Sequence, residues 1–304
     1  MEIPARPSTL SARDGRGGRG FARYTAVVLA PLLPSSRSDS RDLSPRAPLR
    51  SWVSDVHVMS AVPSPPAGWT RLPSGTTSLV ACWTGGEPVV AAVGPLQRAT
   101  FKPSGVVPLY ARLSFHPGGA RPALGVAAHE LVDRVVPLDD LWGARARELR
   151  HALARAGGDP AAAVRLLEDA LCRAVGARAD APARRALLRR AVDVLDASAL
   201  APDSDASIPA LARRLRVAER TLRALFHEEI GISPKRYARI ARIRRAAERL
   251  ATTSLARLAS ETGFYDQAHL TAEFRSLLGV TPRAYLAGAR PAARPGCGGA
   301  SARG

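Results

Sequence analysis

The chain has 304 residues, 46% of them hydrophobic, so it is long and apolar enough for two folded domains. Its net charge of +18 does not by itself indicate a nucleic-acid partner, because nearly all of the positive charge is arginine in an alanine-rich composition typical of a GC-rich genome. The one apolar run near the N-terminus, residues 24–34, is far shorter than the roughly 20 residues of a transmembrane helix, which excludes a membrane span there.

Residues 1–47 are rich in Arg, Ser, Pro and Gly, a composition that predicts a disordered N-terminal extension. The arginines before the apolar run give it only a weak likeness to a signal peptide. The three cysteines, Cys82, Cys172 and Cys297, form no C-x-x-C pair and have no zinc-ligand spacing. We therefore expect a reduced, cytoplasmic protein without a metal site and without a cofactor.

Short strands are predicted over residues 48–120, because apolar runs and apolar–polar alternation recur there between turn signals rich in Gly and Pro. The predicted strands are Val53–Val58, Ser78–Trp83, Pro88–Val93 and Tyr110–Phe115. Strands of this length and spacing are typical of a small barrel or sandwich. We assign residues 48–156, which end in a helix, to a β-rich sensor or dimerisation domain.

Helical periodicity replaces the strand pattern after residue 122. A helix is expected to end near Ala156, a second to begin at Asp159-Pro160, and a third to span Asp180–Ala199. The polar segment 202–205 breaks this pattern, so residues 157–203 are assigned to a helical linker region. Residues 291–304 are predicted to be a disordered tail.

Residues 204–290 contain an internal repeat. The segment Gly231–Tyr237 returns as Gly279–Tyr285, and Leu222 and Phe226 return as Leu270 and Phe274, all 48 positions later. Such a repeat indicates one supersecondary unit that occurs twice. Each repeat unit is predicted to form two short helices around a turn. The segment as a whole is therefore predicted to be an all-α domain with two helix-turn-helix units.

The first unit has a short helix that ends at Leu215 and a second helix over Glu219–Glu229, which leaves Arg220, Arg223, Ala224 and His227 on the outer face. Ser233-Pro234 is typical of an N-cap followed by proline at the first helical position. The linking helix that it begins is expected to reach Leu250.

The second unit begins at Ser254, a predicted N-cap, and turns at Gly263–Tyr265. Asp266 is predicted to cap the second helix, whose outer face and flanks carry Gln267, His269, Thr271, Ala272 and Arg275. Thr281-Pro282 begins a closing helix. A pair of such units on one linking helix fits successive major grooves, about 34–36 Å apart on one face of the duplex.

The charge of residues 204–290 supports a polyanionic partner. This segment has 16 Lys and Arg against 8 Asp and Glu, a net charge of +8 that exceeds that of any other part of the chain. A protein of this kind is expected to bind double-stranded DNA in a salt-dependent manner.

These motifs closely resemble the DNA-binding domain of the AraC/XylS family of bacterial transcription regulators. The resemblance rests on Leu211-Ala212, Leu222 to Phe226, Gly231, Pro234, Tyr237, Leu258-Ala259, Gly263-Phe264, Asp266 to Leu270, Phe274, Gly279, Thr281-Pro282 and Tyr285. It implies a transcription regulator that binds promoter DNA, with RNA polymerase, a small-molecule effector and a second copy of the chain as further partners.

The chain departs from the family pattern at four positions. Ala224 and Ala272 stand where many members have an arginine on the recognition helices, Arg216 replaces the usual turn glycine, and Ala218 replaces the usual capping serine. Residues 48–156 also resemble the N-terminal region of one AraC-type subgroup, through Leu72–Gly75, Gly94-Pro95, Phe115–Ala120 and Val136–Gly143. This second likeness implies a β-rich, cupin-like module.

Two groups of candidate DNA-binding residues follow. Arg220, Arg223, Gln267 and His269 are expected to read bases, and Arg244, Arg245 and Arg275 to hold phosphates. The neighbouring Thr221, His227 and Thr271 complete the candidate interface. The arginine-rich face of the linking helix, Arg236 to Arg249, is equally consistent with phosphate contacts and with a merely solvated surface.

The alternatives are a metal cupin and an enzyme. His57 and His116 are too far apart for a metal cluster, and no P-loop, G-x-S-x-G elbow or H-E-x-x-H motif occurs. Asp139-Asp140 is better explained as stabilising a helix start than as a catalytic pair. We therefore expect that the protein is not an enzyme. The rival hypothesis is a ligand-binding or catalytic protein whose helical half has lost specific DNA recognition.

Overall fold

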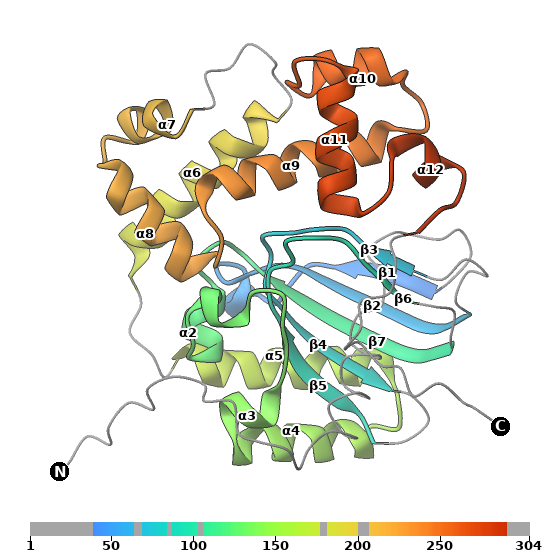
Figure 1. Ribbon diagram of the computed structural model, residues 1–304. Helices are drawn as coiled ribbons and strands as arrows, with labels where there is room; N and C mark the ends of the chain where they lie inside the picture. The colour runs from blue at the N-terminus through green and yellow to red at the C-terminus, as the bar shows by residue number, and fades with distance from the viewer. Residues whose placement is uncertain are drawn as a thin grey trace, which may run out of the picture.

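The structure is a computed structural model that describes residues 39–63, 69–83, 87–102, 106–176, 181–199 and 207–290. It has a β-rich N-terminal half and an all-helical C-terminal half, which confirms the expected fold class. Figure 1 shows the C-terminal helices on one side of the main sheet and the helices of residues 138–176 on the other.

The main sheet is antiparallel, with strand order β1-β2-β7-β4-β5-β8. Its strands are β1 Asp39–Leu43, β2 Val53–Pro63, β4 Ser78–Trp83, β5 Val89–Val93, β7 Val106–Phe115 and β8 Val135–Pro137. A small second sheet pairs β3 (Trp69–Arg71) with β6 (Thr100–Lys102). Among the described residues the two edge strands, β1 and β8, do not pair with each other, so the sheet is not closed. A sandwich therefore fits better than a closed barrel.

The two faces of the main sheet have different environments, because successive side chains of a strand point to opposite faces. Leu79, Ala81, Ala111 and Leu113 lie in the large core, on the face covered by the helices of residues 138–176. On the opposite face, Val80, Cys82, Ala91, Val93 and Tyr110 form a smaller cluster.

Short helices and two long ones complete the N-terminal half. They are η1 Ala47–Leu49, α2 Ala120–Leu124, η2 Ala128–Leu131, α3 Leu138–Trp142, α4 Ala144–Arg155 and α5 Pro160–Gly176. The helix predicted to end near Ala156 is α4, and Gly143, which has a φ of 56°, separates it from α3. Helix α5 begins at Pro160 as expected, and the carboxylate of Asp159 accepts from the backbone N–H groups of Ala161 and Ala162 at 3.1 Å.

The C-terminal half consists of seven helices in the described residues. They are α6 Pro182–Ser198, α7 Ile208–Leu215, α8 Glu219–Glu229, α9 Pro234–Arg249, α10 Leu255–Glu261, α11 Gln267–Leu278 and α12 Pro282–Leu286. The predicted linker region is shared between the two halves. Helix α5 buries Leu167 and Leu171 against the sheet, whereas α6 buries Leu188 and Leu195 among the C-terminal helices.

One boundary needs correction. Residues 39–47 are not part of a disordered extension, because Asp39–Leu43 forms β1 and pairs along its whole length with β2. An edge strand gains its order from main-chain hydrogen bonds, which the polar sequence of β1 does not reveal. The predictions for residues 1–38 and 291–304 lie outside the described residues, as does Cys297. No helix in the described ranges has the length and apolarity that crossing a membrane demands.

Candidate nucleic-acid interface

The first helix-turn-helix unit is α7 and α8. Ser207 caps α7 by accepting from the N–H of Ala210, while Leu222, Leu225 and Phe226 bury the inner face of α8. Ala218 is the N-cap of α8 and makes no side-chain capping bond there. The inner face therefore anchors α8, and its outer face remains available.

Arg216, in the turn of this unit, has a left-handed backbone with φ of 56°. This conformation costs a non-glycine residue about 1–2 kcal/mol, partly offset by the extra chain entropy that glycine loses on folding. We expect Arg216→Gly to raise the free energy of unfolding by about 0.5–1 kcal/mol, measured by urea denaturation. Arg214→Gly, at an exposed position in the last turn of α7, is the matched control and should lower it by up to about 1 kcal/mol. The same sign for both variants would contradict the expectation.

The second unit is α10 and α11, and its predicted caps are confirmed. Ser254 accepts from the N–H of Arg257, and Asp266 accepts from the N–H of His269 at 2.7 Å. Phe274 is completely buried, as is its counterpart in the first unit, and each packs edge-on against a tyrosine of the helix that follows. The repeated sequence thus builds the same aromatic contact twice.

Helix α9 connects the units. Its 16 residues give it a length of about 24 Å at 1.5 Å per residue. Ser233 caps it with Pro234 at the first position, as predicted, and Ile240, Ile243 and Ala246 are buried along it. Figure 1 shows α8 near one end of α9 and α11 near the other, so the two recognition helices are held on one rod.

Most of the predicted DNA-binding residues on the recognition helices are exposed. On α8 these are Arg220, Thr221, Arg223 and His227; on α11 they are Gln267 and His269, with Thr271 partly exposed. Arg275 is exposed on α11 as well. Ala224 and Ala272, the two departures from the family pattern, are exposed at the same faces. The recognition helices therefore present open outer faces that carry polar groups beside two small apolar residues.

Several of these residues have intramolecular partners: the hydroxyl of Thr271 donates to the carbonyl of Gln267, and the ring of His269 contacts Phe264 edge-on. Arg223 pairs with Glu219 at 2.8 Å, although 64% of its side chain is exposed. An exposed pair four residues apart on a helix contributes only about 0.3–0.5 kcal/mol, so a base or phosphate can displace Glu219. His227 stacks on His129 of η2, with ring centroids 4.2 Å apart. The stack covers one face of the His227 imidazole, although the residue as a whole is exposed.

The arginines of α9 are mostly bound to the protein itself, so the solvated-face alternative does not describe them. Arg236 donates to the carbonyl of Gln97 at 2.8 Å, and Arg239 pairs with Glu273 at 2.8 Å. Arg242 donates to the carbonyl of Gly263. Burial lowers the pKa of both Arg236 and Arg242. These side chains brace the fold.

The structure changes the expectation for Arg244. Its guanidinium donates to the carbonyl of Pro73 at 3.3 Å, so it faces the β-rich half rather than open solvent. Arg245 pairs with Glu248 at 3.1 Å and keeps an exposed side chain. Of the three predicted phosphate contacts, Arg245 and Arg275 remain accessible, whereas Arg244 does not in this arrangement.

The two halves also meet at α8. Glu228 and Glu229 pair with Arg121 of α2 and Arg184 of α6. Gly231 lies so close to η2 that a Cβ atom there would be 2.6 Å from the carbonyl oxygen of Ala128. The C-terminal end of α8 is therefore docked on the N-terminal half, and its N-terminal end is free.

No cluster of three or more potential metal-ligating side chains was found in the described part of the chain. Asp139 and Asp140 occupy the first turn of α3, and Asp139 also lies 3.4 Å from Arg150. Trp83 is buried in the large core. The indole N–H of Trp142 donates to the carbonyl of Ala123. These contacts give each of the four residues a structural role.

Residues 211–288 match the family described as a helix-turn-helix domain, and this range contains both repeated units. The C-terminal domain is an AraC-type helix-turn-helix domain. The match of this domain supports a DNA-binding transcription regulator. No curated protein matched the chain.

Several solved structures are similar to the chain. One is a transcriptional regulator with an AraC-type DNA-binding domain from Chromobacterium violaceum, 25% identical, covering 37% of this chain and 100% of its own, with a TM-score of 0.32. A probable AraC family transcriptional regulator from Rhodopseudomonas palustris is 24% identical over 35% of this chain and 99% of its own, with a TM-score of 0.30. ToxT from Vibrio cholerae is 9% identical over 83% of this chain and 97% of its own, with a TM-score of 0.37.

Proposed function

We propose that this protein is a sequence-specific regulator of transcription whose helices α8 and α11 read bases in successive major grooves of promoter DNA. The observation that carries the proposal is the open outer face of both recognition helices on one connecting helix. The AraC-type domain supplies the class of activity, and the exposed polar side chains supply the means of reading a sequence.

Arg220 and Arg223 of α8 and Gln267 and His269 of α11 are proposed to contact base edges, flanked by Thr221 and Thr271. Arginine can make a bidentate contact with guanine, and glutamine with adenine, so these side chains suit direct readout. Arg245 and Arg275 are proposed to hold phosphates, which position the domain without selecting a sequence.

We further propose that a small molecule modulates this activity through the β-rich half. That half contacts α8, α9 and α11, and the N–H of Ala99 donates to the carbonyl of Leu277 at 2.8 Å. A ligand that binds the docked and undocked arrangements with different affinities shifts the population between them. The contact surface thus gives a ligand a route to the recognition helices.

A second candidate function is favoured by Ala224 and Ala272. Both are exposed on the recognition helices, and neither can donate or accept a side-chain hydrogen bond to a base. On this view the protein binds a ligand or catalyses a reaction, and its AraC-type domain has lost specific recognition.

Selection from random duplex DNA by the full chain separates the two candidates. We expect enrichment of one motif with two half-sites about 10–10.5 base pairs apart. Affinity for the selected duplex should fall as salt rises, with a log–log slope of about −0.9 per phosphate contact. Absence of an enriched motif at physiological salt would support the second candidate instead.

A further inference from the structure

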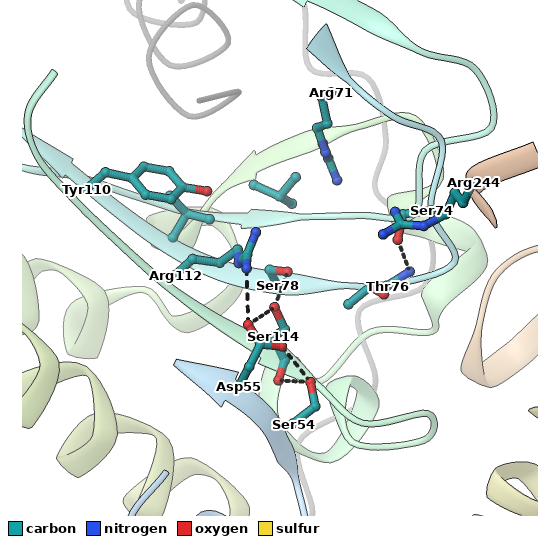
Figure 2. A pocket seen from close by; sticks show the side chains of 12 residues that line it. Ser54, Asp55, Arg71, Ser74, Thr76, Ser78, Tyr110, Arg112, Ser114 and Arg244 are labelled. Atoms are coloured by element: carbon teal, nitrogen blue, oxygen red, sulfur yellow. Dashed lines mark hydrogen bonds and ion pairs between the residues drawn. The ribbon is translucent and has the colours of Figure 1, made fainter. Parts of the chain in front are cut away.

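A polar cavity lies on the face of the main sheet that is opposite α5. It has a volume of about 170 Å³ and is lined by residues of the sheet, of the 71–76 segment and of α9. Figure 2 shows Tyr110, Arg112 and Ser114 of β7 at this cavity, with Arg71 and Arg244 beside it. Strand alternation explains the first three, because residues 110, 112 and 114 share one face of β7.

Arg71 is a buried cation in this cavity, only 8% exposed. Burial lowers its pKa to about 10, which still leaves the guanidinium charged at neutral pH. Its Nη2 donates to the carbonyl of Gly94 at 3.1 Å, and within the described residues no carboxylate pairs with it. Asp133 acts on it only at longer range and accepts hydrogen bonds from Gln97. Burying a charge without a counter-charge is costly.

Arg112 provides a second buried cation with unused donors. Its Nη2 reaches Asp55 at 3.1 Å, but its Nε and Nη1 are buried without a hydrogen-bond partner in the described part of the chain. Asp55 also accepts from the hydroxyl of Ser114 at 3.1 Å. Because buried donors are nearly always paired in native proteins, the two free groups indicate an absent acceptor.

The charges of the lining do not balance. Three arginines, Arg71, Arg112 and Arg244, face one carboxylate, Asp55. Tyr110 adds no negative charge, since burial raises the pKa of its phenol. Hydroxyl groups of Ser74, Thr76 and Ser78 complete the polar wall and can donate to oxygen atoms or accept from a ligand hydroxyl.

We propose that this cavity binds a small oxyanion, a phosphate or phosphate monoester or a short carboxylate, between Arg71, Arg112 and Arg244. Guanidinium groups match the geometry of both anions and bind them in bidentate fashion. The volume is below the roughly 300–1,000 Å³ of pockets for drug-sized ligands, which favours a compact anion.

The position of Arg244 makes the site regulatory. Arg244 belongs to α9, which carries both recognition helices, and it already joins the β-rich half through Pro73. A second cavity of about 290 Å³, lined in part by Tyr237 and Asp196, shares Ser74, Thr76 and Arg244 with the first. An anion held by arginines from both halves therefore stabilises their docked arrangement. This regulatory role rests on the proposed function, whereas the binding itself does not.

Calorimetry on the full chain without DNA tests the site. At matched ionic strength, inorganic phosphate or succinate is expected to bind saturably with one site per chain, while chloride is not. Preference for phosphate assigns a phosphoryl ligand, and preference for succinate assigns a carboxylate. Arg71→Gln and Arg112→Gln should each weaken binding by about 10- to 100-fold, the usual effect of losing hydrogen bonds to a charged group.

Three further variants keep the test sound if a buried substitution prevents folding. Arg244→Gln, at a half-buried position of α9, should weaken anion binding and leave the fold intact. Arg220→Gln and Arg275→Gln, on the open DNA-facing helices, are the matched controls and should bind the anion as the native chain does. Loss of binding in these controls, or no saturable binding of either anion, overturns the proposal. If the chain binds the anion but selects no DNA motif, the anion site is supported and the proposed regulatory function is refuted.

Discussion

Replacing Phe274 by alanine is expected to lower the free energy of unfolding by about 3–5 kcal/mol, the range for removal of a buried phenyl ring. Phe274 is fully buried in the core that joins α6 to α12, and it packs edge-on against Tyr285. The loss should therefore reach both helix-turn-helix units. Urea denaturation followed by far-ultraviolet circular dichroism measures it.

Tyr265 gives a matched control, because it is an aromatic residue of the same unit with 94% of its surface exposed. Tyr265→Ala should change the free energy of unfolding by less than about 0.5 kcal/mol, as surface substitutions usually do. A small effect at Phe274, comparable with that at Tyr265, would show that α11 is not packed as described.

Arg223→Ala is expected to relax base preference at one position of the selected duplex by about 1–3 kcal/mol, while affinity for random duplex changes little. The exposed pair with Glu219 is weak enough to be exchanged for a guanine edge. Arg275→Ala and Arg245→Ala, in contrast, should weaken binding to all sequences alike and reduce the salt slope by about 1 each. Competition titrations with single-base variants of the duplex distinguish these outcomes.

Arg147 is a suitable control for charge alone, since it is an exposed arginine on α4, in the β-rich half. Arg147→Ala should leave both specific and random binding unchanged. Equal losses on specific and random duplex from Arg223→Ala would refute its assignment as a base-reading residue. A loss from Arg147→Ala would show that net charge, rather than the recognition helices, governs affinity.

The docked arrangement restricts how α8 meets DNA. Its N-terminal end, with Arg220 and Arg223, is open, but its C-terminal end is held by the stacking of His227 on His129 and by the pairs of Glu228. Recognition helices generally present their N-terminal residues to the bases, so the docked form is compatible with base contact by the first turns. The stack on His129 holds the His227 ring against η2 while leaving the residue exposed.

The local features of the AraC-type domain were predictable from the sequence. Ser233, Ser254, Asp266 and Thr281 all cap the helices that they were expected to cap, and α8 begins and ends as predicted. Caps and helix periodicity depend on residues a few positions apart, which any sequence displays directly. The repeat at 48 residues extended the same information from one unit to the other.

The partners of the charged residues were not predictable. Arg244 contacts a carbonyl 171 positions away, and Arg121 meets a carboxylate 107 positions away. The sequence showed that Arg112 alternates with apolar residues in a strand, a sign of a polar group on a sheet face, yet nothing indicated that Arg71 would lie near it.

The sequence by itself determined the two helix-turn-helix units, their caps and the outward positions of the base-reading residues, because those features follow from short-range periodicity. Only the tertiary structure decided that most arginines of α9 brace the protein, that α8 is partly docked, and that Arg71, Arg112 and Arg244 share a cavity. The physical reason is that electrostatic and hydrogen-bond pairing depends on distance in space, and packing brings together groups that the chain separates by more than a hundred residues.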